Sequence, residues 1–258
     1  CAALKTVKLP QNGKLNTIGV DAFSFSDGQP APQITEITIP ASVTTIDRGA
    51  FEGCSKLKKV TFAPNSGLQT IGDNAFGRCH KDLIFCYSDE IGKTALTKAG
   101  VSADIIKPAK PTVTFDSNDG SNVKAKTVEN GKEISEPTAP TKDGYIFAGW
   151  YMDKALTEKY DFNTAIMDNM TLYAKWTPGG TCGVGGKLTW TLDGGTLTIS
   201  GSGAMEDYIG PGEQPWANQR SSINKVVIGG GVTSIGQQAF TDCSQLSTVE
   251  LPQNGALE

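Results

Sequence analysis

Apolar residues recur along this chain with a spacing that a single helix or an ordinary sheet does not produce. Residues 54–79 open with Cys, followed by Leu three positions on, Val three further and Phe two beyond, and residues 1–16 and 243–258 open with nearly the same frame. A second landmark keeps the phase, because Ile precedes Phe by five residues at four places. Self-similarity of this kind predicts a repeat architecture. The four pairs are Ile18 and Phe23, Ile46 and Phe51, Ile71 and Phe76, and Ile235 and Phe240.

The repeat unit spans 23 to 25 residues, and its length varies only in the connecting loops. Each unit carries one short run in which apolar and polar residues alternate, such as residues 4–9, 34–39 and 57–62. This alternation predicts a strand with one buried face. A unit of this size cannot bury its apolar side alone, so it must stack on copies of itself. The pattern therefore predicts a solenoid with one such strand in each coil.

The cysteines keep the same phase as the apolar residues. Cys54, Cys79 and Cys243 each follow a repeat Phe by three residues, and Cys1 opens the same frame. Free cysteine often behaves as a small buried hydrophobe. The spacing favours a column of stacked core thiols, with a disulfide or a metal site as the alternatives. For Cys1, the lipid-modified first residue of a mature lipoprotein is a further alternative.

The pattern L-x-x-V-x-L-P…L-x-x-I-G-x-x-A-F-x-x-C resembles the BspA-type, or Treponema pallidum-type, leucine-rich repeat of bacterial surface proteins. The resemblance covers residues 1 to about 87 and about 223 to 258. The sequence departs from the pattern at Asp47, where other copies have Gly, at Ser26, where Cys is expected, and at Ala63, which displaces the proline.

A short amphipathic helix is expected after the first array. Ser88 suits the N-cap, Asp89 and Glu90 suit the first turn, and Gly100 suits the position past the end. Such a helix would cover the exposed last coil with Ile91, Ala95, Leu96 and Ala99 on its inner side. We therefore predict a solenoid with a cap helix over residues 1–107 and a proline-containing linker over residues 108–111.

Residues 112–177 follow a different pattern, with alternating strands separated by Gly, Asn, Asp and Pro turns. The pieces G-Y-x-F-x-G-W (144–150) and L-Y-A-x-W (172–176) resemble the Listeria–Bacteroides repeat, also called the internalin B-repeat. This resemblance implies a small β-grasp-like domain. Residues 178–258 then hold two strands around Asp193, a predicted hairpin, and lead into a second, truncated repeat array. The fold class is therefore mostly β.

Composition and charge argue against some classes of function but do not identify one. The chain of 258 residues has 38% hydrophobic residues and a formal net charge of −4. This balance offers no general attraction to nucleic acid or anionic lipid, and no apolar run is long enough for a transmembrane helix. The chain starts and stops at matching points of a repeat, which predicts that it is a piece of a longer protein.

Residues for catalysis or metal binding are sparse. His80 is the single histidine, and the chain has no C-x-x-C, P-loop or H-E-x-x-H motif. Residues 116–120 place Gly at the fifth position of a calcium-type loop, so a hairpin turn is favoured there. Trp150, Trp176 and Trp190 are expected in cores rather than on a sugar-stacking platform, and Trp216 is left open. We predict no enzyme activity, no catalytic or metal-binding residues and no cofactor.

The remaining candidate site is the outward face of the stacked strands. Rigid faces of this kind are how solenoids bind proteins. The resemblance implies a non-catalytic, adhesin-like module on a bacterial cell surface, hence extracellular, with a protein or glycoprotein ligand. A passive stalk and a carbohydrate-binding accessory module are the alternatives. The candidate binding residues, called the ladder residues below, are Thr6, Lys8, Glu36, Thr38, Lys59 and Thr61; Lys225, Thr248 and Glu250 are their equivalents in the second array.

Overall fold

A computed structural model describes residues 4–11, 13–25, 31–210 and 212–253. The predictions for Cys1 and Ser26 concern residues outside these ranges. The described chain is mostly β, with α1 (Glu90–Lys98) and the short 3-10 helices η1 (Ala103–Ile105), η2 (Val184–Gly186) and η3 (Ala217–Ser222). Contacts group the chain into two units. Unit 1 holds Cys1–Thr114, Ala125–Ser135 and Phe162–Met170, and unit 2 holds Phe115–Lys124, Glu136–Asp161 and Thr171–Glu258.

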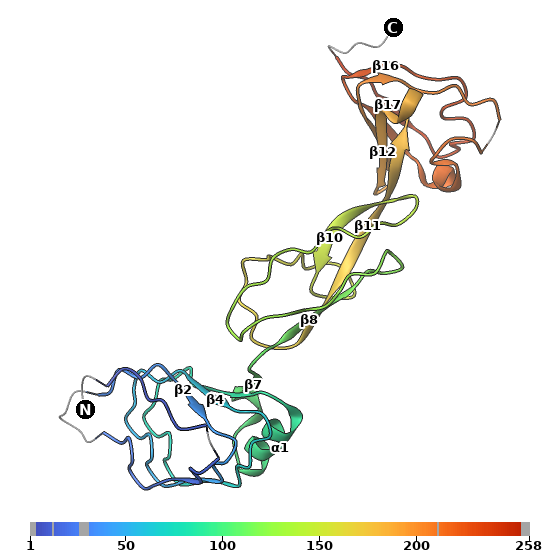
Figure 1. Cartoon of the computed structure of the whole chain (residues 1–258). Coiled ribbons are helices and arrows are strands. Elements are labelled where there is room, and N and C mark those ends of the chain that lie inside the picture. Colours follow the sequence, from blue (N-terminus) through green and yellow to red (C-terminus); the bar gives the residue numbers. More distant parts are fainter. Residues whose placement is uncertain (1–3, 12, 26–30, 211, 254–258) are drawn as a thin grey trace. The chain divides into compact units, whose positions relative to one another are not determined.

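Unit 1 contains the predicted solenoid (Figure 1). Two parallel sheets run along it, in the orders β2-β4-β6-β7 and β1-β3-β5. β8, which begins in this unit, pairs with β9 in the antiparallel sense. The strands are β1 (Thr17–Ile18), β2 (Glu36–Ile39), β3 (Thr45–Ile46), β4 (Lys59–Phe62), β5 (Thr70–Ile71), β6 (Ile84–Tyr87), β7 (Ile106–Pro108), β8 (Thr112–Asp116) and β9 (Lys126–Thr127).

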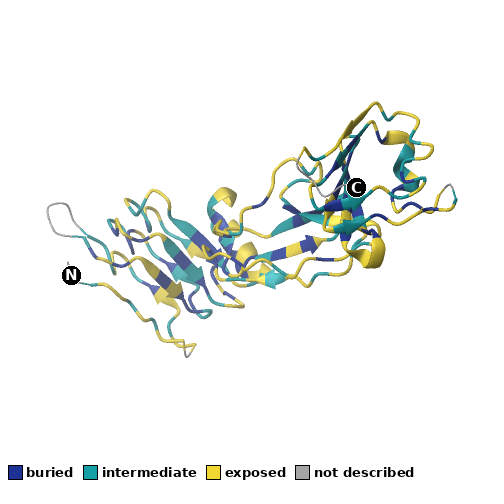
Figure 2. Ribbon diagram, turned by 90° about the horizontal axis from the view of Figure 1, so that it is seen from above, coloured by how far each residue is buried: buried dark blue, intermediate teal, exposed yellow. Residues whose placement is uncertain are grey.

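The core of the solenoid is built from the recurring apolar positions. Buried and more exposed residues alternate along β2 and β4, as Figure 2 shows. The repeat phenylalanines form a stack, with ring centroids 5.2 Å apart for Phe23 and Phe51 and 5.1 Å apart for Phe51 and Phe76. Because equivalent residues of successive coils lie in contact, the solenoid prediction is confirmed.

Each repeat turn also has a recurrent backbone geometry. The residue two before the repeat Phe has a positive φ at Asp21, Gly49, Asn74 and Gln238. Only Gly, and to a lesser degree Asn and Asp, adopts this left-handed conformation at low cost. The small or polar residues at this position therefore follow from the backbone of the turn.

The first coil differs from the prediction. Residues 4–9 were expected to form a strand, but they have no regular secondary structure. Leu4, Val7 and Leu9 nevertheless pack against the core. Hydrophobic contact is non-directional, whereas a strand needs a ladder of aligned hydrogen bonds, so the packing is kept without the pairing.

The cap helix forms, with two corrections. The N-cap is Asp89 rather than Ser88, because the Asp89 carboxylate accepts the Gly92 N–H, while the Ser88 hydroxyl donates to the Phe62 carbonyl. This moves the helix start by one residue, and Ile91 is 56% exposed instead of buried. Ala95 and Leu96 do pack into the core.

Residues 108–111, the expected linker, are held by hydrogen bonds. Pro108 ends β7, which pairs with β6, and the Ala109 N–H donates to the Tyr87 carbonyl. The side-chain amide of Asn130 donates to the Pro108 carbonyl, and the Asn130 N–H donates to the Ala109 carbonyl. This segment therefore has defined partners within unit 1. The domain boundaries themselves stay a prediction.

Unit 2 is built around a long strand, β11. Residues 173–178 of β11 pair with β10, and residues 179–182 pair with β12, so one strand serves two antiparallel partners. β12 turns into β13 through Gly194 and Gly195, both with positive φ, and β13 pairs in parallel with β15. The strands are β10 (Tyr145–Tyr151), β11 (Met170–Cys182), β12 (Leu188–Asp193), β13 (Thr196–Gly201), β14 (Gly203–Ala204), β15 (Lys225–Ile228), β16 (Val232–Ser234) and β17 (Thr248–Glu250).

Trp216 belongs to the second array. It is fully buried and stacks on Phe240, with centroids 6.0 Å apart and planes 23° apart. It precedes Phe240 by 24 residues, which is one repeat length, so a tryptophan stands where other coils have phenylalanine. The repeat thus begins earlier than the prediction of about residue 223. The β-grasp-like topology of residues 112–177 stays a prediction.

Candidate binding surface

The six ladder residues line a single hollow of about 820 Å³, called the ladder hollow below. Thr6 and Lys8 come from the first coil, Glu36 and Thr38 from β2, and Lys59 and Thr61 from β4. In the pairing of β2 with β4, Glu36 lies opposite Lys59, and Thr38 lies opposite Thr61. Residues far apart in the sequence are therefore brought to one surface.

Strand alternation explains why the ladder residues of β2 and β4 face outward. Ile37 and Ile39 of β2 and Val60 and Phe62 of β4 are buried in the core. Because successive strand residues point to opposite sides, the residues between them must face away from the core.

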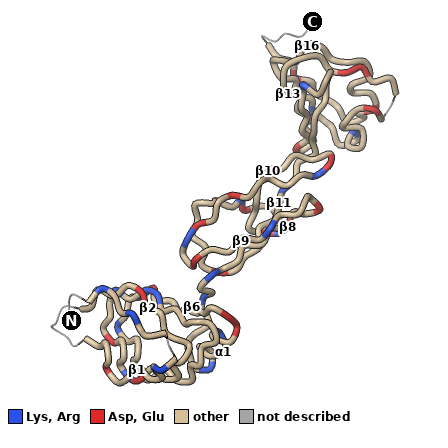
Figure 3. Tube along the Cα trace, in the orientation of Figure 1, with Lys and Arg blue, Asp and Glu red and all other residues tan. Residues whose placement is uncertain are grey.

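Charges of both signs meet in the ladder hollow. Lys8, Glu36, Lys59 and Glu129 all line it, and Figure 3 shows Lys and Arg interspersed with Asp and Glu along unit 1. The Lys59 ammonium donates to the Asn130 carbonyl at 3.4 Å. The surface is suited to a partner that itself carries both signs, and it is not a basic patch for a polyanion.

Sequence reasoning missed Glu129, which lies outside the repeats. Its loop is fixed by Asn130, whose buried side-chain amide donates to the carbonyls of Pro108 and Met167. An Asn-Gly dipeptide such as Asn130-Gly131 is typical of a turn, but no local signal places this turn beside the solenoid strands.

In the second array two of the equivalent residues, Lys225 and Glu250, form an ion pair with each other. The Lys225 ammonium lies 2.7 Å from the Glu250 carboxylate, and Lys225 lies opposite Thr248 in the strand pairing. An ion pair within the surface leaves less charge for a partner than the ladder hollow offers.

Cys54 and Cys79 are free thiols that donate hydrogen bonds to the neighbouring coil. The Cys54 thiol donates to the Phe23 carbonyl at 3.4 Å, and the Cys79 thiol donates to the Phe51 carbonyl at 3.3 Å. Burial raises the pKa of Cys54 to about 11 and that of Cys79 to about 12. Protonated thiols are poor nucleophiles and poor metal ligands, so these residues serve the core.

The other candidate groups have structural partners. The ring nitrogen Nδ1 of His80 accepts the Asp82 N–H. The Asp116 carboxylate accepts the Asn118 N–H in a turn where Asn118 and Asp119 both have positive φ. Across the described ranges, His, Cys, Asp and Glu side chains do not gather in a group that could hold a metal ion.

The tryptophans do not form an exposed row. Trp150, Trp190 and Trp216 are buried. The half-buried Trp176 donates its indole N–H to the Ser117 carbonyl. Within the part of the chain that the structure describes, no helix has the length and apolar character needed to cross a membrane.

The fold thus defines a repeat protein in which solenoid coils alternate with a second β module. Family models match the same two repeat types that the sequence resembles. The BspA type leucine rich repeat region matches residues 29–97 and 215–256 in six copies, and the Listeria-Bacteroides repeat domain matches residues 112–175. The chain therefore carries BspA-type leucine-rich repeats in two segments and one Listeria–Bacteroides repeat domain between them.

Individual relatives match over short stretches. A protein of Evansella cellulosilytica provisionally named Gly-rich membrane protein is 51% identical over 65 residues, covering 25% of this chain and 8% of the relative. Internalin H of Listeria monocytogenes is 39% identical over 90 residues, covering 33% of this chain and 15% of the relative. The matched stretches are thus a small part of each relative.

A solved leucine-rich repeat protein from Eubacterium ventriosum is 35% identical with a TM-score of 0.28, covering 30% of this chain and 21% of that protein. Among the family and curated matches, the repeat types are those of surface proteins that interact with other proteins, and they are typically non-enzymatic.

Proposed function

We propose that this chain is a non-catalytic binding module of a bacterial cell surface, adhesin-like, and that the ladder residues contact a protein of a host or neighbouring cell. The observation that carries the proposal is the convergence of six residues from three coils on one hollow. The internalin name of one relative is consistent with a surface location.

The physical basis is a pre-organised surface. The four ladder residues of β2 and β4 stand on strands whose inner residues are buried, so a partner does not have to order this backbone when it binds. Opposite charges at fixed separations favour a partner with the matching pattern and disfavour others. A protein surface can supply such a pattern.

The test is binding of the whole chain to a panel of extracellular-matrix proteins and a glycan array, followed by a double charge reversal, Lys8→Glu with Glu36→Lys. The double variant keeps the net charge, and both side chains are exposed, so folding should be unaffected. We expect at least about a tenfold loss of affinity for a matrix protein, since two charge contacts become repulsive.

The matched control is Lys56→Glu with Asp82→Lys, two exposed residues outside the ladder hollow. Equal loss in both double variants would remove the ladder residues from the contact surface. Binding to glycans alone would favour the carbohydrate-binding accessory module, and binding to neither class would favour the passive stalk.

A further inference from the structure

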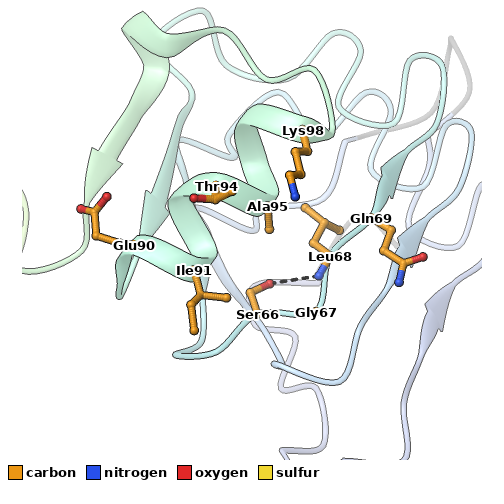
Figure 4. A pocket seen from close by; sticks show the side chains of 9 residues that line it. All are labelled: Ser66, Gly67, Leu68, Gln69, Glu90, Ile91, Thr94, Ala95 and Lys98. Carbon is orange, nitrogen blue, oxygen red and sulfur yellow. Dashed lines mark hydrogen bonds between the residues drawn. The ribbon is translucent and has the colours of Figure 1, made fainter.

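Unit 1 has a second hollow, of about 580 Å³, between the loop after β4 and the cap helix α1 (Figure 4). We call it the cap hollow. It lies within the size range of pockets that take small ligands and has room for one or two aliphatic side chains. It is lined by Ser66, Gly67, Leu68, Gln69, Glu90, Ile91, Thr94, Ala95 and Lys98.

The cap hollow is apolar at its base and at one rim. Leu68 and Ala95 are buried, whereas Ile91 beside them is 56% exposed. Removing an isoleucine side chain from water is favourable, and the exposed Ile91 does not gain this transfer free energy. A partner that covered Ile91 and filled the hollow would recover it.

The walls of the cap hollow are held by one carboxylate. The Asp89 carboxylate accepts the Gly92 N–H at 2.8 Å from one oxygen and the Asn65 N–H at 2.6 Å from the other. The N-cap of α1 is thereby tied to the loop that forms the opposite wall. A hollow fixed in this way needs little ordering when it is filled, which favours binding.

A cation stands at one end of the cap hollow. Lys98 extends from the last turn of α1 toward Leu68 in Figure 4. The Glu90 carboxylate, at the other end of α1, lies 3.7 Å from the Lys93 ammonium. Lys98 has no ion-pair partner within the described residues. A ligand with a carboxylate next to its apolar group would complement this arrangement.

We propose that the cap hollow receives an apolar side chain of a partner protein and that an acidic residue next to it in the partner's sequence meets Lys98. This contact uses residues distinct from the ladder residues. It shares with the proposed function only the premise that the partner is a protein.

The test uses three blocked hexapeptides with the whole chain. Each contains two central leucines followed by Asp, Asn or Lys, and amide chemical shifts of the ¹⁵N-labelled protein report binding. We expect saturable shifts at Leu68, Ile91 and Ala95. The Asp peptide should bind about threefold more tightly than the Asn peptide, the usual scale of one exposed charge pair.

The net charge of −4 makes this preference informative. If only the overall field acted, the Lys peptide would bind best. A preference for Asp must therefore come from a local cation.

Variants give the decisive comparison. Lys98→Glu should reverse the preference from the Asp to the Lys peptide, and Ile91→Thr should weaken all three peptides by about threefold or more because apolar contact is lost. The matched controls are Lys81→Glu and Val20→Thr, a charged and an aliphatic residue that are exposed elsewhere in unit 1. Neither should change the affinities.

The double ladder variant Lys8→Glu with Glu36→Lys should also bind the peptides normally, which separates this proposal from the proposed function. The proposal is overturned if the shifts do not saturate at millimolar peptide, if the three peptides bind equally, or if Lys98→Glu leaves their order unchanged.

Discussion

At the scale of single residues, the repeat cysteines show how a polar atom is accommodated in a stacked core. The Cys54 thiol is buried, yet it donates a hydrogen bond to the Phe23 carbonyl of the preceding coil. Cys79 repeats the contact with Phe51 one coil further on. The spacing of three between Phe and Cys places a thiol where it can reach the carbonyl of the neighbouring coil's phenylalanine.

The raised pKa of Cys54 predicts a loss of stability at alkaline pH. An ordinary thiol has a pKa of 9.0, and burial raises that of Cys54 to about 11. Above pH 9 the unfolded thiol releases its proton while the folded one keeps it. The stabilising contribution is complete below pH 9 and falls by about 1.4 kcal/mol per pH unit up to pH 11.

The free energy of unfolding is measured for the unsubstituted chain and for Cys54→Ala by guanidinium titration at several pH values between 8 and 11. Far-ultraviolet circular dichroism monitors the unfolding. Other groups titrate in both proteins and cancel in the difference. The free-energy advantage of the unsubstituted chain should therefore shrink as the pH rises. A constant difference would mean that Cys54 titrates normally.

At the scale of the element, the two partners of β11 explain why Gly179 and Gly180 follow the Listeria–Bacteroides repeat domain. Residues 173–178 of β11 pair with β10, and its residues 179–182 pair with β12. At Gly179 a Cβ atom would lie 2.6 Å from the Trp190 carbonyl oxygen and 2.9 Å from the Ile146 side chain. At Gly180 a Cβ atom would approach only to 3.4 Å of the Trp190 indole nitrogen.

The two glycines form a matched pair for mutation. Gly179→Ala should destabilise unit 2 by about 1–3 kcal/mol, because the added methyl group meets backbone that cannot move aside. Gly180→Ala should change the free energy of unfolding by less than about 0.5 kcal/mol. Urea unfolding followed by tryptophan fluorescence measures both, and equal effects would contradict the close approach at Gly179.

At the scale of the whole molecule, the contacts define two units with separate cores. The chain's four tryptophans all lie in unit 2, whereas the stacked Phe23, Phe51 and Phe76 lie in unit 1. Tryptophan fluorescence therefore reports on unit 2 only. Chains with more than one unit need not unfold in a single step.

Phe51→Ala tests whether the units are independent. The ring is fully buried between two stacked neighbours, so its removal should cost about 3–5 kcal/mol in unit 1. The transition seen by circular dichroism should move to lower denaturant, and the tryptophan transition should stay in place. If both move together, the units unfold cooperatively.

Much of this architecture was readable from the chain alone because it depends on spacing. The Ile-to-Phe interval of five and the Phe-to-Cys interval of three located the coils, and strand alternation selected the ladder residues. Local signals were less reliable where neighbours compete. Ser88 and Asp89 are both good N-caps, and Asp89 takes the role because the Phe62 carbonyl binds the Ser88 hydroxyl.

The sequence by itself determined the repeat, its phase and the outward residues, since stacked coils translate a period directly into contacts. Only the tertiary structure decided that residues 4–9 form no strand, that Trp216 replaces a phenylalanine, and that Ile91 faces solvent. It also placed Glu129 beside the ladder residues. Each of these depends on which distant group lies opposite a residue, and no periodicity along the chain carries that information.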